Sequence, residues 1–334
     1  MKAVDEAVLI QVRDWLQAGQ SCWLATVVGT WGSSPRPVGS LLACNDKGQI
    51  VGSLSGGCVE DDLLEKLVSG ELAREQPQYF EYGVSAEDTE RFGLPCGGQL
   101  YIVVEPLQPE PRFQSHFQAI TEHLRQRECI QRTLNLTSGA FELTEVDCHS
   151  ELEYDREKQI LRQTYGPRFQ LFIIGAGMVS RYLAEMAQSL DYLVTVCDPR
   201  EHLLADFDVP GVQKICDMPD DAIRAQASDA MSAIVALTHD PRIDDMGLMQ
   251  ALETAAFYVG AMGSKRTTEN RLIRLKQLDL SDSALARLHA PIGLPIGSKT
   301  PPEIAIAILA EIIAVRHGKH SAHISAPAPE AARA

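Results

Sequence analysis

The sequence contains no apolar run of the roughly 18 residues that a membrane-spanning helix requires. Nor does it open with a charged segment followed by an apolar one, the pattern of a secretion signal. Basic residues are few: 30 Lys and Arg stand against 45 Asp and Glu, which gives a formal net charge of −15. Such a charge opposes binding to nucleic acid or to an anionic membrane. We therefore expect a cytoplasmic protein that has neither as a partner.

Paired cysteines of the C-x-x-C type are also missing among the eight cysteines, which argues against a zinc or iron–sulfur framework. Their scattered placement suits a reducing compartment. Cys22, Cys44 and Cys197 lie inside apolar, strand-like runs and are expected to be core residues. Two other cysteines lie directly beside paired glycines and therefore invite a chemical interpretation.

The first of these is in SLSGGCVE, where Cys58 follows Gly56 and Gly57. Glycine allows a positive φ and a close approach of a ligand to the backbone. Apolar residues recur at helical spacing over 59–68, so Cys58 is predicted at a helix N-terminus. There the dipole and the free N–H groups favour anions and lower a thiol pKa. Three acidic residues that follow oppose a thiolate, so its charge state stays open, and a buried cysteine beside a tight turn is the alternative.

The second is in LPCGG, where Cys96 precedes two glycines. The two motifs mirror one another, so the two thiols could face one ligand from two loops. Two separate tight turns are the simpler structural interpretation.

Residues 1–107 predict a mixed α+β domain. Helical spacing covers 4–18 and starts again at Cys58, whereas β-branched or alternating runs cover 22–29, 41–54, 78–83 and 100–106. Residues 108–166 are polar and weakly periodic, and they predict a connector of uncertain structure.

Residues 167–318 predict a Rossmann-like, doubly wound parallel sheet. LFIIG is a buried strand followed by a glycine turn and a helix, and YLVTVCD is a second strand. The strand-then-loop pattern returns at 232–240 and 255–263. Alternation of this kind indicates an α/β fold with helices on both sheet faces.

The glycine turn GAGMVS has the G-x-G spacing of dinucleotide-binding folds. Gly175 would make the tight turn, Gly177 would let a pyrophosphate approach, and Ser180 takes the small-residue position of strand–helix packing. The phosphates would lie at the helix N-terminus. Asp198 lies about 20 residues on, where the ribose-binding acid is expected. Arg200 either meets an extra phosphate or is a surface charge.

The last helix is predicted by a capping box, in which Thr300 precedes two prolines and Glu303. The run that follows is apolar almost all round, so we expect it to be buried between layers or between subunits. Residues 319–334 are rich in Ala and Pro and predict a disordered tail.

Two enzyme interpretations follow from these motifs. An NAD(P)-dependent oxidoreductase would use the glycine turn and a proton donor, for which His239 and His289 are candidates. Either histidine could equally be structural. A thiol enzyme would use Cys58 as its nucleophile, although no histidine is placed beside it in the sequence.

Eight stretches follow one another along the chain: GTWGSSPRPVGSLL, GSLSGGCVE, FGLPCGGQL, LFIIGAGMVS, DPR, LTHDPRIDD, YVGAMGSKR and RLHAPIGLPIGSKTPPEIAIAILAEIIA. With these stretches the chain resembles the xanthine dehydrogenase accessory factor family, XdhC/CoxI, from about residue 5 to 318. One departure is Met178, where family members often have a histidine.

This resemblance implies a chaperone without catalytic residues that binds the molybdenum cofactor and protects it. It further implies sulfuration of the cofactor with a cysteine desulfurase, and delivery to a molybdenum hydroxylase of the xanthine dehydrogenase or aldehyde oxidase type. A homodimer is expected.

The same resemblance implies roles for individual residues. Cys58 would be a soft ligand to the metal, with Gly56, Gly57 and Cys96 beside the molybdopterin. The Rossmann unit would hold a nucleotide, either NAD(P) or the cytosine or guanine end of a molybdopterin dinucleotide. Phosphate-binding candidates in GSSPRP are Ser33, Ser34 and Arg36.

Overall fold

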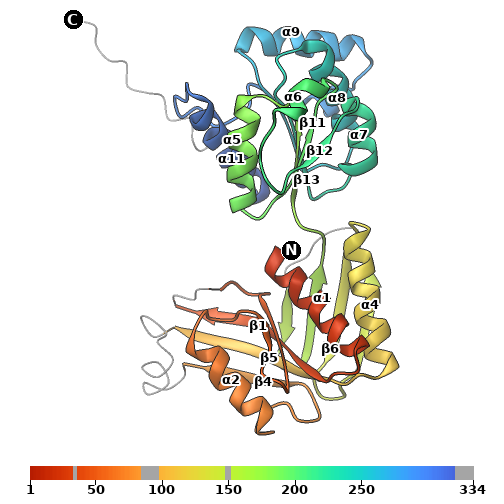
Figure 1. Ribbon diagram of the computed structural model, residues 1–334, viewed down its shortest axis with the longest axis vertical. Coiled ribbons are helices and arrows are strands. Elements are labelled where there is room, and N and C mark those ends of the chain that lie inside the picture. Colours follow the sequence, from red (N-terminus) through yellow and green to blue (C-terminus); the bar gives the residue numbers. More distant parts are fainter. Residues whose placement is uncertain (33–35, 84–97, 147–151, 320–334) are drawn as a thin grey trace, which may run out of the picture. The chain divides into compact units, whose positions relative to one another are not determined.

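The computed structural model describes residues 1–32, 36–83, 98–146 and 152–319, and it divides into two compact units, Met1–Pro167 and Arg168–Ala334 (Figure 1). In the described residues the first unit contains two sheets and the second unit one, and each unit has hydrophobic cores of its own. Within the described ranges, every helix is too short or too polar to cross a bilayer.

The first unit is built on an antiparallel five-stranded sheet in the order β3-β2-β1-β5-β4. Alternate residues of these strands enter two cores, because successive side chains point to opposite faces. One core includes Cys22 and helices α1 and α4, and the other includes Cys44 and helix α2. Burial raises the pKa of the Cys44 thiol to about 12, as expected for a core cysteine. The elements are α1 (Ala3–Gln17), β1 (Cys22–Trp31), β2 (Leu41–Asn45), β3 (Ile50–Gly52), α2 (Cys58–Val68), β4 (Gln78–Tyr82), β5 (Gln99–Leu107) and α4 (Pro111–Arg125).

Residues 108–166, which the sequence suggested as a connector, instead contain helix α4 and a four-stranded sheet in the order β7-β6-β9-β8. Burial in β6 alternates residue by residue, so one sheet face is covered and the other is partly exposed. The many polar residues on that second face explain why the sequence looked irregular. The strands are β6 (Ile130–Asn135), β7 (Phe141–Glu145), β8 (Glu153–Asp155) and β9 (Ile160–Tyr165).

A buried ion pair joins this second sheet to the first. The two Nη atoms of Arg132 donate to the two carboxylate oxygens of Glu105 at 2.8 and 2.7 Å, and its Nε donates to Nε2 of His116 at 2.8 Å. Burial, followed by the charge of Arg132, lowers the pKa of His116 to about 3, so the imidazole is neutral and can accept this bond. The segment is therefore part of the first unit.

The second unit confirms the predicted Rossmann-like fold. All neighbouring strands in its six-stranded sheet, β12-β11-β10-β13-β14-β15, run parallel. The strands are β10 (Gln170–Ile174), β11 (Leu193–Cys197), β12 (Gln213–Ile215), β13 (Ser232–Ala236), β14 (Tyr258–Ala261) and β15 (Leu288–His289).

Helices cover both faces of this sheet. Helices α5 and α11 share one core with it, and α7, α8 and α9 contribute to the other, on the opposite side (Figure 1). The helices of the unit are α5 (Met178–Ser189), α6 (Glu201–Ala205), α7 (Pro219–Gln226), α8 (Pro241–Glu253), α9 (Lys265–Gln277), α10 (Asp282–Leu285) and α11 (Pro301–Arg316).

The apolar helix α11 completes the core of the second unit. It begins with the predicted capping box, in which the N–H of Thr300 donates to Glu303 at 3.0 Å. Ala305, Ile308 and Ile312 are buried between α5 and the sheet. Of the two predicted locations, burial between layers is therefore the one that the structure contains.

Candidate functional site

The glycine turn lies between β10 and α5, and its two glycines serve different needs. Gly175 has φ +106°, and a Cβ there would lie 2.8 Å from Cγ2 of Thr238, so a side chain is excluded by strain and by space. Gly177 is extended and is the N-cap of α5, and a Cβ there would meet no described atom within 4 Å. Among the described residues, no side chain caps this helix end. The turn therefore leaves the first N–H groups of α5 accessible to an anionic ligand.

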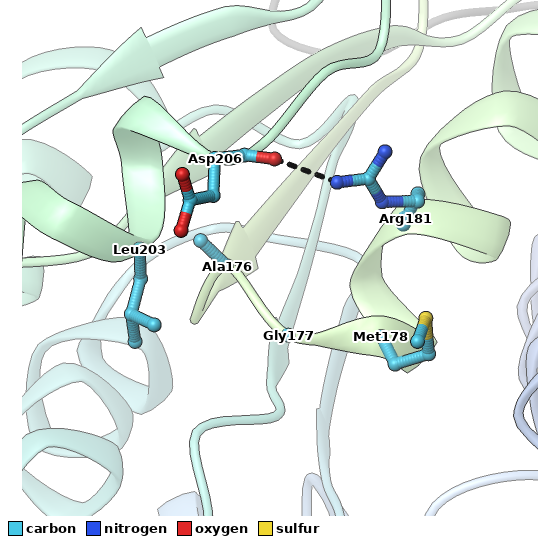
Figure 2. Close-up of a pocket in the computed structure, with 6 residues that line it drawn as sticks. All are labelled: Ala176, Gly177, Met178, Arg181, Leu203 and Asp206. Carbon is cyan, nitrogen blue, oxygen red and sulfur yellow. Dashed lines mark hydrogen bonds between the residues drawn. The ribbon is translucent and has the colours of Figure 1, made fainter.

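A pocket of about 400 Å³ opens beside this turn (Figure 2). The turn and the start of α5 form one side, and helix α6 with the residue after it forms the other. Sequence reasoning found the half of its lining that lies in the GAGMVS motif and missed Arg181, Leu203 and Asp206, because no motif connects α5 to the chain after β11. The lining residues are Ala176, Gly177, Met178, Arg181, Leu203 and Asp206.

Asp198 lies at the turn, and its buried carboxylate already has four hydrogen-bond donors. It accepts hydrogen bonds from the N–H of Ala176 at 2.9 Å and from the N–H of Arg200 at 3.0 Å. Nε and Nη2 of Arg200 each donate to it at 2.8 Å. Asp198 is 0% exposed. Burial raises the pKa of Asp198, but the bonds from Arg200 and Ala176 outweigh this and hold it below its ordinary value.

Ser180 is also completely buried, and its Oγ has no hydrogen-bond partner in the described part of the chain. It therefore lies at the packing position between α5 and the sheet rather than in the pocket. Arg200 is partly exposed, and its guanidinium binds the Asp198 carboxylate through two hydrogen bonds.

The carboxyl ends of β10 and β13 meet at the point where the strand order reverses, which is where open α/β sheets bind ligands. His239 lies there, exposed and in the left-handed conformation with φ +63°. The loop that contains His239 is held in place by the carboxylate of Asp244. Oγ1 of Thr238 donates to Asp244 at 2.7 Å, and Nη2 of Arg271 donates to the same carboxylate at 3.1 Å.

His289, in contrast, is part of a closed polar cluster. Its ring stacks on Tyr258 with centroids 4.5 Å apart, and its Nδ1 lies 3.4 Å from Glu311. Glu311 also accepts from the Tyr258 hydroxyl at 2.5 Å and from the N–H of Gly293 at 2.7 Å. This arrangement fits the structural interpretation of His289.

The loop before α2 in the first unit is organised around one carboxylate, that of Glu60. The backbone N–H groups of residues 54–57 donate to it at 2.8 to 3.0 Å, and the hydroxyls of Ser53 and Ser55 add two more bonds at 2.9 and 2.7 Å. Burial raises the pKa of Glu60, but the bonds from Ser55, Gly56 and Gly57 overcome it and bring the pKa to about 2. The two glycine amides are therefore not free to hold an anionic ligand.

Two family models match the chain, the XdhC Rossmann domain over residues 171–312 and the XdhC and CoxI family over residues 15–83. The chain belongs to the XdhC/CoxI family. It is 25% identical to a protein of Bacillus subtilis named as a probable xanthine dehydrogenase subunit, over 90% of this chain and 95% of the relative. It is 26% identical to the molybdenum cofactor insertion chaperone PaoD of Escherichia coli, over 90% of this chain and 85% of PaoD.

A solved structure described as a xanthine dehydrogenase from Bacillus halodurans has a similar fold. It is 25% identical, the match covers 97% of this XdhC/CoxI chain and 98% of the other, and the TM-score is 0.71. The likeness therefore extends over both units.

The remaining residues predicted for an XdhC/CoxI site are placed only in part. Arg36 is partly buried. Burial raises the pKa of Asp5 above its ordinary value, and the charge of Arg36 opposes part of this rise. Cys58 is the first residue of α2, as predicted, and its side chain lies outside the described part of the chain. Ser33, Ser34 and Cys96 also lie outside the described residues.

Proposed function

We propose that this XdhC/CoxI protein is an accessory factor that binds the molybdenum cofactor and delivers it to a molybdenum hydroxylase of the xanthine dehydrogenase type. The similarity to the insertion chaperone PaoD over 90% of the chain supports the binding role. The B. subtilis relative, whose name refers to xanthine dehydrogenase, supports the class of client enzyme. As further parts of the proposal, the protein acts as a homodimer and supports sulfuration of the cofactor with a cysteine desulfurase.

The observation that carries this proposal is the open glycine turn with its pocket of about 400 Å³. Among the residues that the structure describes, none fills the space in front of Gly177 and no side chain caps α5, so its first N–H groups are available to a phosphate. These features fit the nucleotide end of a dinucleotide form of the cofactor.

The metal end of the cofactor is proposed to bind to Cys58. A thiolate is a soft ligand suited to such a centre, and the bound cofactor would supply the molybdenum chemistry used later by the client enzyme. Because Glu60 occupies the amides of Gly56 and Gly57, these glycines would contribute space for the ligand rather than hydrogen bonds to it.

The alternative is an NAD(P)-dependent oxidoreductase, which is favoured by the exposed His239 at the strand-order reversal. The buried carboxylate of Asp198, which Arg200 occupies, weighs against NAD(P) bound in the manner typical of Rossmann dehydrogenases, where this acid accepts from the ribose. We expect no steady NADH or NADPH formation from alcohols, aldehydes or hydroxy acids. Turnover that is lost in Gly177→Asp would favour the oxidoreductase instead.

The test of the proposal uses Cys58→Ser in full-length protein purified from molybdate-fed cells. The variant should fold normally and lose most of its bound cofactor, measured as the fluorescent pterin formed on oxidation and as molybdenum content. Cys216→Ser is the matched control, since Cys216 is an exposed free cysteine of the other unit. Equal pterin in Cys58→Ser and the wild type would contradict the proposed role of Cys58.

A further inference from the structure

The acid that a Rossmann motif assigns to the nucleotide sugar cannot take that role in this structure without breaking its existing bonds. The Asp198 carboxylate already accepts four hydrogen bonds, one from the N–H of Ala176 and three from N–H groups of Arg200. It is 0% exposed, so a sugar could reach it only after Arg200 had moved away. Asp198 instead connects the backbone of Ala176, in the glycine turn, to Arg200.

A second carboxylate, that of Asp206, faces the same turn from the other side of the pocket. Asp206 is exposed, and within the described chain no group donates a hydrogen bond to its carboxylate. Figure 2 shows this carboxylate on the side of Ala176 and Leu203, whereas its backbone carbonyl points toward Arg181. Unlike Asp198, Asp206 therefore has its acceptor positions available.

The position of Asp206 is held by the chain around it. Nη2 of Arg181 donates to the backbone oxygen of Asp206 at 2.7 Å, and its Nη1 donates to that of Asp208 at 3.4 Å. The same guanidinium lies 5.8 Å from the ring centroid of Phe207. Arg181 thus holds the backbone of this turn and leaves the Asp206 carboxylate free to meet a ligand.

We propose that Asp206, rather than Asp198, accepts hydrogen bonds from the sugar hydroxyls of a ribonucleoside diphosphate whose phosphates lie at the N-terminus of α5. The apolar side chains of Met178 and Leu203, which also line the pocket, would contact the uncharged faces of the nucleotide. This inference rests on the proposed function in one respect, namely that the second unit holds the nucleotide end of the cofactor.

The experiment measures binding of CDP and GDP, and of their 2′-deoxy forms, to the full-length protein by isothermal titration calorimetry. Loss of one hydroxyl that donates to a charged acceptor weakens binding about tenfold. We expect that preference for the ribonucleotides in the wild type and its loss in Asp206→Ala; the deoxy forms, which keep the 3′-hydroxyl, should lose less affinity than the ribonucleotides. Asp208→Ala is the matched control, because Arg181 contacts the backbone of both residues and Asp208 does not line the pocket.

The variant Asp198→Asn distinguishes the role of Asp198 from that of Asp206. It should weaken both sugar forms alike, through the glycine turn, and keep the preference between them. The inference is overturned if the preference survives in Asp206→Ala, if it disappears in Asp198→Asn alone, or if no nucleotide binds to the wild type. Pterin retention, measured separately on the same preparations, would still report on the proposed function in each of these cases.

Discussion

Replacing Glu60 by Gln tests how the loop before Cys58 is stabilised. The carboxylate accepts six hydrogen bonds, and its pKa falls from an ordinary 4.5 to about 2. One pKa unit corresponds to about 1.4 kcal/mol, so the full shift corresponds to about 3 kcal/mol. Gly56 and Gly57 are exposed, so solvent screens part of this electrostatic stabilisation. We expect Glu60→Gln to lower the free energy of unfolding of the first unit by about 2 kcal/mol at pH 7.

The pH dependence of this effect has a definite sign. Because the folded pKa of Glu60 is lower than the unfolded one, its contribution is complete above about pH 4.5 and is lost as the pH falls toward 2. The stability difference between wild type and Glu60→Gln should therefore shrink to roughly half or less of its neutral value by pH 3. Comparing the two proteins at each pH removes the contribution of the other carboxylates.

Urea unfolding followed by tryptophan fluorescence is the appropriate assay, because all three tryptophans, at positions 15, 23 and 31, lie in the first unit. Glu65→Gln is the control, since Glu65 is an exposed acid on the same helix, and it should change stability by less than about 0.5 kcal/mol. A Glu60→Gln effect no larger than this control, or one that does not change between pH 7 and pH 3, would refute the reasoning.

Two further predictions concern the second unit. Gly175→Ala should destabilise it by about 1–3 kcal/mol, because of the positive φ and the contact with Thr238. Gly177→Ala should instead fold normally and weaken nucleotide binding. Equal melting temperatures of the two variants, measured by circular dichroism, would contradict this. Arg271→Met should cost about 3–5 kcal/mol in urea unfolding, since it leaves the buried Asp244 without its ion pair. A change below about 1 kcal/mol would show that the pair is dispensable.

Local chemistry made much of the second unit predictable. The turn at Gly175 needs a positive φ that only glycine adopts freely, and the capping box at Thr300 satisfies the end of a helix from residues a few positions away. Runs of apolar residues predicted the buried parallel strands, because both sheet faces are covered and no polar alternation is needed. These features depend on neighbours in the sequence, so the sequence by itself determined them.

Packing decided the rest. Residues 108–166 looked irregular because one face of their sheet is exposed, and the buried pair of Glu105 and Arg132 that connects them to the first sheet has no signal in the sequence. The same holds at the glycine turn, where spacing placed an acid at Asp198 but could not reveal that Arg200 donates to its carboxylate. Which donors reach a carboxylate, and which acid is left free in the pocket, depends on distances that the tertiary structure alone determines.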